Sequence, residues 1–231
     1  MFHLKYKFIS IIRKKSSRSI EVYKNRFTNK FYTVKKIKNN FYNPIEVDIL
    51  EKMKGCSNIQ QLKAIYKNFS SIRIVYEHYP GMDLFDRVKY TNFIKDKKSI
   101  YRLIISMAQC IKSCHNRGFS HNDIKMENFV FDKNCQLILI DFGHAKSFDN
   151  QHRLRILTTP YYSPPEFYNG DFNVTSDVFS LGIIYRDLLI MFKEYDPFIL
   201  KMTKYNYKKR ATIEEVIDHL KILKSEMLVT V

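Results

Sequence analysis

His121-Asn122-Asp123-Ile124-Lys125-Met126-Glu127-Asn128 is the stretch that decides the fold of this 231-residue chain, and Asp141-Phe142-Gly143 follows it after a short interval. Between them, the apolar runs Phe129-Val130-Phe131 and Leu137-Ile138-Leu139-Ile140 flank the turn-forming residues Asp132-Lys133-Asn134. Apolar runs on both sides of a turn cluster predict a β-hairpin. We expect this hairpin to fold the two polar stretches back together at one edge of a cleft.

The polar side chains of this edge suit phosphoryl transfer. That reaction needs metal ions and cations to spread the charge of the moving phosphoryl group, and a hydroxyl held in line with it. Asp123 supplies a carboxylate that can accept the proton of the attacking hydroxyl, and Lys125 an ammonium group that can neutralise the phosphate. Asn128 and Asp141 supply oxygen ligands of the kind that Mg²⁺ prefers.

The two stretches resemble the catalytic loop of eukaryotic protein kinases, His-Arg-Asp-x-Lys-x-x-Asn, and their metal-binding triplet, Asp-Phe-Gly. Lys125, two places after Asp123, resembles the serine/threonine-specific branch. The resemblance implies an α+β, two-lobed protein kinase fold with a small antiparallel β-rich N-lobe and a mainly helical C-lobe. It also implies a transferase that uses ATP and Mg²⁺ to phosphorylate serine and threonine hydroxyls of protein substrates. We expect one domain, with the N-lobe at 1–76, the hinge at 77–82 and the C-lobe at 83–231.

The resemblance continues downstream. Thr158-Thr159-Pro160-Tyr161-Tyr162-Ser163-Pro164-Pro165-Glu166 resembles the end of a kinase activation segment, in which Thr159 would support the catalytic loop. Asp177 resembles the aspartate of the buried central helix that holds the backbone of that loop. Arg210 resembles the arginine that forms a buried ion pair with the glutamate at position 166. Little sequence separates the central helix from Asp196-Pro197-Phe198, so we expect the helix that usually comes next to be shortened or absent.

The upstream sequence resembles the nucleotide-binding half of a kinase. Phe31-Tyr32-Thr33-Val34-Lys35-Lys36-Ile37 resembles the third strand, with Lys35 on the phosphates, and Glu46 would be its helix partner. Ile72 to Gly81 resembles the fifth strand running into the hinge, with Tyr76 as the bulky gate behind the adenine. The resemblance implies the following residues at the nucleotide: Val22, Thr33, Lys35, Glu46, Glu77, Tyr79 and Val130.

The glycine-rich loop of kinases, Gly-x-Gly-x-x-Gly-x-Val, has no counterpart. Counted back from Val22, its glycines would fall on Lys15, Ser17 and Ile20. Glycines there normally let backbone amides approach the phosphates closely. The loss of all three favours a looser lid, and it leaves open an alternative, a pseudokinase scaffold with weak or no catalysis.

The phosphorylation switch of many kinases is also missing. Asn122 stands where they have an arginine that pairs with a phosphate on the activation segment, and Arg155 occupies the phosphorylatable position. Charge-driven ordering of the segment needs both the arginine and the phosphate. We therefore hypothesise that the segment needs no phosphorylation.

The composition is strongly basic, with a net charge of +16 at pH 7. Such charge can bind nucleic acid, so a basic nucleic-acid-binding protein on a kinase fold is a third alternative. The basic residues are scattered over different elements, however, which favours a solvated basic surface. The four cysteines show no metal-type spacing, and we expect Cys110 and Cys114, one helical turn apart, to be reduced core residues. No apolar run is long enough to span a membrane. We expect a monomeric intracellular protein of the cytoplasm or nucleus.

Two acidic residues bear on substrate choice. Glu127 and Asp83 match kinase positions where carboxylates face basic residues that precede the phosphorylated serine or threonine. Charge-assisted pairing makes a basic peptide a suitable substrate. The Asp83-Leu84-Phe85-Asp86 run resembles the calmodulin-dependent-kinase-like group.

Overall fold

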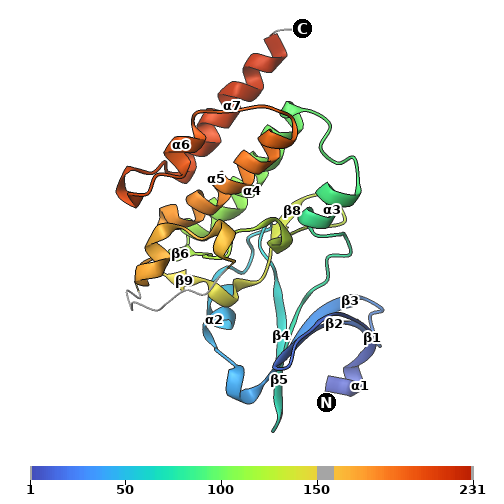
Figure 1. The fold of residues 1–231 in the computed structure, drawn as a ribbon. Helices are drawn as coiled ribbons and strands as arrows, with labels where there is room; N and C mark the ends of the chain where they lie inside the picture. Colours follow the sequence, from blue (N-terminus) through green and yellow to red (C-terminus); the bar gives the residue numbers. More distant parts are fainter. Residues whose placement is uncertain (1, 150–158, 230–231) are drawn as a thin grey trace.

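The computed structural model describes residues 2–149 and 159–229, apart from the side chains of 227–229. Figure 1 shows two regions, a sheet that contains the N-terminus and a group of helices that contains the C-terminus. The chain passes from one to the other between Glu77, the last residue of β5, and Leu84, the first of α3. This is the α+β, two-lobed arrangement that the sequence predicts.

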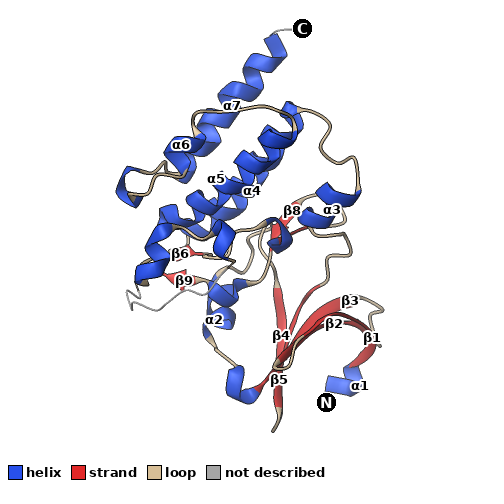
Figure 2. Ribbon diagram, in the orientation of Figure 1, coloured by secondary structure: helices blue, strands red, loops and turns tan. Residues whose placement is uncertain are grey.

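The N-lobe is built on one five-stranded antiparallel sheet with the strand order β1-β2-β3-β5-β4. Figure 2 shows the strands in red and the helix α2, Ile45–Lys52, between the sheet and the C-lobe. The strands are β1, Tyr6–Lys14; β2, Arg18–Asn25; β3, Phe31–Lys38; β4, Leu62–Lys67; and β5, Ser71–Glu77. The predicted third and fifth strands are therefore confirmed.

Alternation along the strands gives this sheet two different faces. Val34 pairs with Val75 on the outer face, where both pack against Phe2 of the short helix α1, Phe2–Lys5, and against Tyr6. Lys35, the next residue of β3, therefore projects from the opposite face, which looks toward the C-lobe. The aromatic cluster of the outer face holds the sheet that places this lysine.

The C-lobe is built around α4, Lys97–His115, and α5, Val174–Met191, which lie side by side at its centre (Figure 1). Asp96 caps α4 by accepting a hydrogen bond from the amide of Ser99 at 2.6 Å. The remaining helices are α3, Leu84–Tyr90; α6, Ile199–Met202; and α7, Ile213–Val229. The predicted core helix from Ile100 to Cys114 is thus confirmed as part of α4.

The segment after α5 is short, as the sequence predicts. Only residues 192–198 separate α5 from the single turn of α6, and none of these described residues is helical. Gly182 lets α6 pack directly on α5, because a Cβ atom there would lie 2.9 Å from the Cβ of Met202. The helix that follows the central one in kinases is therefore absent from these residues.

Short strands place the two polar stretches. β7, Phe129–Phe131, pairs with β8, Leu137–Leu139, in the predicted hairpin, with Val130 opposite Ile138. β6, Phe119–Ser120, pairs with β9, Lys146–Ser147, on the far side of the two stretches. Residues 121–128 and 141–143 are therefore held together at both ends.

Candidate active site

The backbone of the catalytic loop, residues 121–128, is fixed by a carboxylate from the core. Asp177 on α5 is almost fully buried and accepts hydrogen bonds from the amides of His121, at 2.9 Å, and Asn122, at 2.8 Å. His115 lies 2.9 Å from the same carboxylate. Burial raises the pKa of Asp177, but the hydrogen bond and charge of His115 outweigh it and hold this pKa below its usual range. The aspartate can thus stay ionised and keep the loop in place.

The functional groups of the loop contact one another. Lys125 Nζ donates to Asp123 Oδ2 at 2.7 Å and to Thr159 Oγ1 at 3.2 Å. Asn128 Nδ2 donates to the carbonyl oxygen of Asp123 at 2.8 Å and to its Oδ2 at 3.0 Å. Because the amide nitrogen of Asn128 is used in this way, its amide oxygen is the atom free to bind a cation. The structure thus brings together the residues that the sequence predicts here.

A lysine with two carboxylate partners lies across the cleft from the loop. Lys35 Nζ is 2.7 Å from Glu46 Oε2 on α2 and 3.0 Å from Asp141 Oδ1. Burial lowers the pKa of Lys35, but the charges of Asp141 and Glu46 more than compensate and raise it. Burial likewise raises the pKa of Asp141, and the Lys35 ammonium outweighs this effect and holds it below the usual range. Lys35 and Asp141 are therefore both charged near neutral pH.

The glutamate has a further partner that sequence reasoning missed. Tyr76 is 2% exposed, and its hydroxyl donates to Glu46 Oε1 at 2.7 Å. Glu46 is the second residue of α2, so little of the helix precedes it. The tyrosine expected as a gate behind the adenine therefore also holds the glutamate that pairs with Lys35.

The backbone at Asp141 is in the left-handed conformation, with φ of 62°, which aspartate tolerates better than most residues. Its amide donates to Gln60 Oε1 at 3.0 Å. The ring of the next residue, Phe142, meets His121 edge to face with centroids 4.9 Å apart. These contacts place the carboxylate of Asp141 beside Lys35.

A cleft of about 210 Å³ opens between the sheet and the catalytic loop. The predicted residues that line it are Thr33, Lys35, Glu46, Glu77, Tyr79, Asn128, Val130 and Asp141. Thr33 Oγ1 lies 3.0 Å from His78 Nδ1, so the hinge is hydrogen-bonded to the third strand beside this cleft. A larger hollow of about 380 Å³, between α3, α4 and the β7–β8 hairpin, is lined by none of the predicted site residues.

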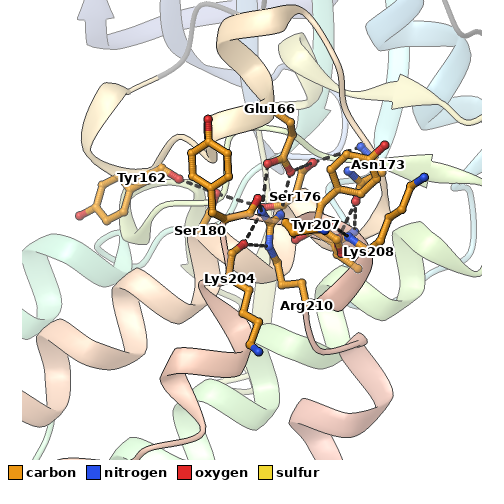
Figure 3. Close-up of polar contacts among 12 residues, drawn as sticks. Tyr162, Glu166, Asn173, Ser176, Ser180, Lys204, Tyr207, Lys208 and Arg210 are labelled. Atoms are coloured by element: carbon orange, nitrogen blue, oxygen red, sulfur yellow. Dashed lines mark hydrogen bonds and ion pairs between the residues drawn. The ribbon is translucent and has the colours of Figure 1, made fainter.

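A buried ion pair lies at the start of α5, the helix that carries Asp177 (Figure 3). Arg210 Nη1 lies 2.7 Å from Glu166 Oε1, and Nη2 donates to Oε2 at 3.0 Å. Ser176 at the start of α5 donates to the same Oε1 at 2.7 Å, and Lys204 accepts from the guanidinium through its carbonyl oxygen. The predicted pair between Glu166 and Arg210 is confirmed.

Comparison with known families agrees with this geometry. The family model described as "Protein kinase domain" matches residues 16–196, more than half of the chain. The chain belongs to the protein kinase family. Members of this family generally use ATP and Mg²⁺.

Several relatives of this kinase are named as calcium-dependent. It is 28% identical over 210 residues to calcium-dependent protein kinase 5 of Plasmodium falciparum, covering 75% of this chain and 36% of the relative. It is 34% identical over 168 residues to calcium-dependent protein kinase 22 of Arabidopsis thaliana, covering 66% and 32%. It is 35% identical over 153 residues to calcium/calmodulin-dependent serine/threonine-protein kinase 1 of rice, covering 62% and 25%. The match spans between a quarter and about a third of these relatives.

One predicted nucleotide residue of the kinase is placed differently. Val22 is buried in β2 but does not line the cleft, whereas Ile20 does, together with Ile12 of β1. The cause is the strand register, in which Ile20 rather than Val22 pairs with Lys35. Counted back from Ile20, the glycine positions of the kinase loop fall on Arg13, Lys15 and Arg18.

The two residues considered for substrate choice in this kinase both line the cleft. Asp83 accepts a hydrogen bond from the amide of Asp86 at 2.9 Å and so caps α3. Glu127 has a buried Oε2 atom with no hydrogen-bond partner among the described residues. The carboxylate of Asp83 is thus occupied in capping α3, whereas Oε2 of Glu127 makes no hydrogen bond within the described residues.

Of the two predicted switch positions, the structure describes only Asn122. Asn122 is buried, has φ of 63°, and donates from Nδ2 to the carbonyl oxygen of His144 at 3.2 Å. Arg155 lies outside the described residues. None of the helices in the described part of this kinase is long and apolar enough to cross a membrane.

Proposed function

We propose that this chain is a serine/threonine protein kinase that transfers the γ-phosphoryl group of ATP to hydroxyl groups of protein substrates. The observation that carries the proposal is the joint presence of two arrays at one cleft. One is Lys35 between Glu46 and Asp141, at 2.7 and 3.0 Å. The other is Asp123 held by Lys125 and Asn128.

Each group has a definite part in the transfer. The substrate hydroxyl oxygen forms a bond to the γ-phosphorus, and the bond from that phosphorus to the bridging oxygen breaks, leaving ADP. The hydroxyl proton goes to the carboxylate of Asp123, whose Oδ2 accepts a hydrogen bond from Asn128, a residue that lines the cleft. Lys125 compensates the charge on the transferring group, and Lys35 holds the other phosphates. Lys125 also spans Asp123 and Thr159, so it is positioned before the nucleotide arrives.

The donor set at the cleft fits magnesium. The side chain of Asp141 is 40% exposed, although Lys35 contacts its Oδ1, so the carboxylate is accessible from the cleft. Asn128 adds a neutral amide oxygen, and magnesium takes such hard oxygen ligands together with water and phosphate. The ion supplies charge neutralisation for the phosphates when it is bound. Asp141 and Asn128 are the residues that would hold it.

The test is transfer of labelled phosphate from ATP to a serine- or threonine-containing basic peptide, with Asp123→Asn as the matched variant. We expect a loss of about 10²–10⁴ in kcat, because proton transfer by a positioned base contributes about this much. Peptides that carry serine, threonine or tyrosine at the same place test the class of hydroxyl. Transfer by the unmodified chain no faster than by the variant would overturn the enzyme assignment.

The altered lid favours a second candidate, a pseudokinase scaffold. The positions of the three kinase glycines hold Arg13, Lys15 and Arg18 instead. The same assay separates the two functions, since a scaffold binds nucleotide or partners without the Asp123-dependent transfer.

We propose a basic peptide as substrate because of Glu127. Its Oε2 atom is buried and has no hydrogen-bond partner in the described part of the chain, and a buried carboxylate oxygen gains much from a charged donor. Replacing arginine by alanine before the target serine should raise KM for the unmodified chain and much less for Glu127→Gln. Equal effects in both proteins would contradict this role.

A further inference from the structure

The lid of the cleft, residues 13–20, has a backbone unlike a glycine-rich loop. β1 and β2 stay paired up to Lys14 and Ser19, with two shifts of register along the way. The amide of Lys15 then donates to the carbonyl oxygen of Arg18 at 2.8 Å and closes the hairpin in a tight turn. The amide of Lys38 also donates to the carbonyl oxygen of Ser17, at 3.0 Å. The amide of Lys15 is thus used within the hairpin, and the carbonyl oxygen of Ser17 fixes the turn to β3.

The register of β2 decides which lid side chains face the nucleotide. Ile20 lines the cleft and pairs with Lys35, whose ammonium group lies in the cleft. Arg18 is two residues before Ile20, so its side chain leaves the same face of the strand. Ser19, between them, leaves the outer face, where it bonds to Glu21. Arg18 is therefore the cation of the turn that points to the same side as Lys35.

Arg18 lies at the turn end of β2, on the face of the sheet that carries Ile20 and Lys35. It is only partly exposed, and it forms no ion pair with any residue that the structure describes. Arg13 of β1 lines the cleft itself. A guanidinium group without a carboxylate partner among the described residues thus leaves the lid on the same side as Lys35, which contacts the proposed magnesium ligand Asp141.

We propose that Arg18 binds the phosphate groups of the nucleotide and takes over the task that glycine amides perform in other kinases. This inference rests on the proposed function, since it assigns a residue to the phosphates of ATP. A planar guanidinium suits the role, because it can donate two parallel hydrogen bonds to one phosphate group. It also explains how a lid without glycines can still hold a triphosphate.

Calorimetric titration of the full chain with ATP and with adenosine tests this assignment directly. Arg18→Ala should weaken ATP about tenfold, since a hydrogen bond to a charged group contributes about this factor. Adenosine, which has no phosphate, should change less than about twofold. Arg18→Lys, which keeps the charge but loses the fork, should lie between the two proteins. These readouts need no phosphoryl transfer.

Lys14→Ala is the matched control. It removes one positive charge from the same hairpin, but Lys14 pairs with Ser19 and so leaves the outer face. ATP affinity of this variant should stay within about twofold of the unmodified chain. An equal loss in Lys14→Ala, unchanged ATP affinity in Arg18→Ala, or an equal loss for ATP and adenosine would each overturn the role of Arg18. Selective loss without any transfer activity would keep this role and overturn the enzyme, whereas an unmodified chain that does not bind ATP would overturn both.

Discussion

The catalytic loop, residues 121–128, and the lid, residues 13–20, border the same cleft and are held in different ways. The loop is tied to buried carboxylates from the core, with Asp177 on its backbone and Lys125 between Asp123 and Thr159. The lid is a sheet hairpin whose basic side chains are mostly exposed. The reacting side chains of the loop are thus held by several hydrogen bonds, whereas the lid side chain proposed to bind the nucleotide would do so through its charge.

This difference shows which parts of a kinase can change their chemistry. A reacting carboxylate must keep its place to within a fraction of an ångström, so its supporting contacts cannot be exchanged singly. Phosphates attract any cation that reaches them, and a backbone amide can be replaced by a guanidinium group. The loop therefore keeps the kinase pattern while the lid departs from it.

The largest loss of folding stability should come from breaking the buried ion pair between Glu166 and Arg210. Arg210→Ala leaves Glu166 buried without its partner, and removal of one member of a buried ion pair costs about 3–5 kcal/mol. Denaturant unfolding of the two proteins measures this loss. Lys201→Ala, which breaks an exposed pair with Glu215, should cost less than about 1 kcal/mol. Equal costs for the two variants would show that the Glu166 pair is no special support.

The second prediction concerns Glu46, the partner of Lys35 in the cleft between lid and loop. Tyr76→Phe removes only the hydroxyl that donates to Glu46 at 2.7 Å. A buried hydrogen bond to a charged group contributes about 1.5–3 kcal/mol, so kcat/KM should fall about tenfold or more. In a Glu46→Ala background, which has no side-chain acceptor for the hydroxyl, the same change should have less than about a twofold effect. Additive losses would mean that Tyr76 does not act through Glu46.

Sequence predicted the loop well because its residues are close together and carry specific chemistry. The hairpin from Phe129 to Leu139, the Lys35 and Glu46 pair, and the Glu166 and Arg210 pair all lie where the spaced motifs indicate. The Glu166 and Arg210 pair joins elements 44 positions apart in the sequence. The resemblance to kinases supplied that long-range information, which periodicity alone lacks.

Sequence predicted the lid less well because nothing local reports strand register. A shift of two residues keeps every side chain on its face, so Val22 and Ile20 fit the alternating pattern equally. The hydroxyl of Tyr76 was missed for a related reason, since periodicity places a side chain on a face but not its polar atom. The strand pairing in the structure fixes the register, and the position of the Tyr76 hydroxyl shows its contact with Glu46.

A smaller effect concerns pH at the hinge beside the lid. Burial lowers the pKa of His78, which lies 3.0 Å from Thr33 Oγ1. As pH falls below about 6.5, the unfolded chain takes up a proton at this histidine before the folded chain does, so folding stability decreases. Denaturant unfolding at pH 7.5 and 5.5 should show a larger decrease for the unmodified chain than for His78→Gln. An equal decrease would remove His78 as a cause.

The smallest expected effect concerns how the activation segment is held. Asn122 tolerates its φ of 63° better than arginine would, and its Nδ2 binds the carbonyl oxygen of His144 at 3.2 Å. We expect this neutral contact to serve without a phosphate partner. Phosphatase treatment, with removal of phosphate checked by mass spectrometry, should therefore change activity less than about twofold. Loss of activity after this treatment would show that a phosphate group orders the activation segment. The contact of Asn122 would then not be enough to hold it.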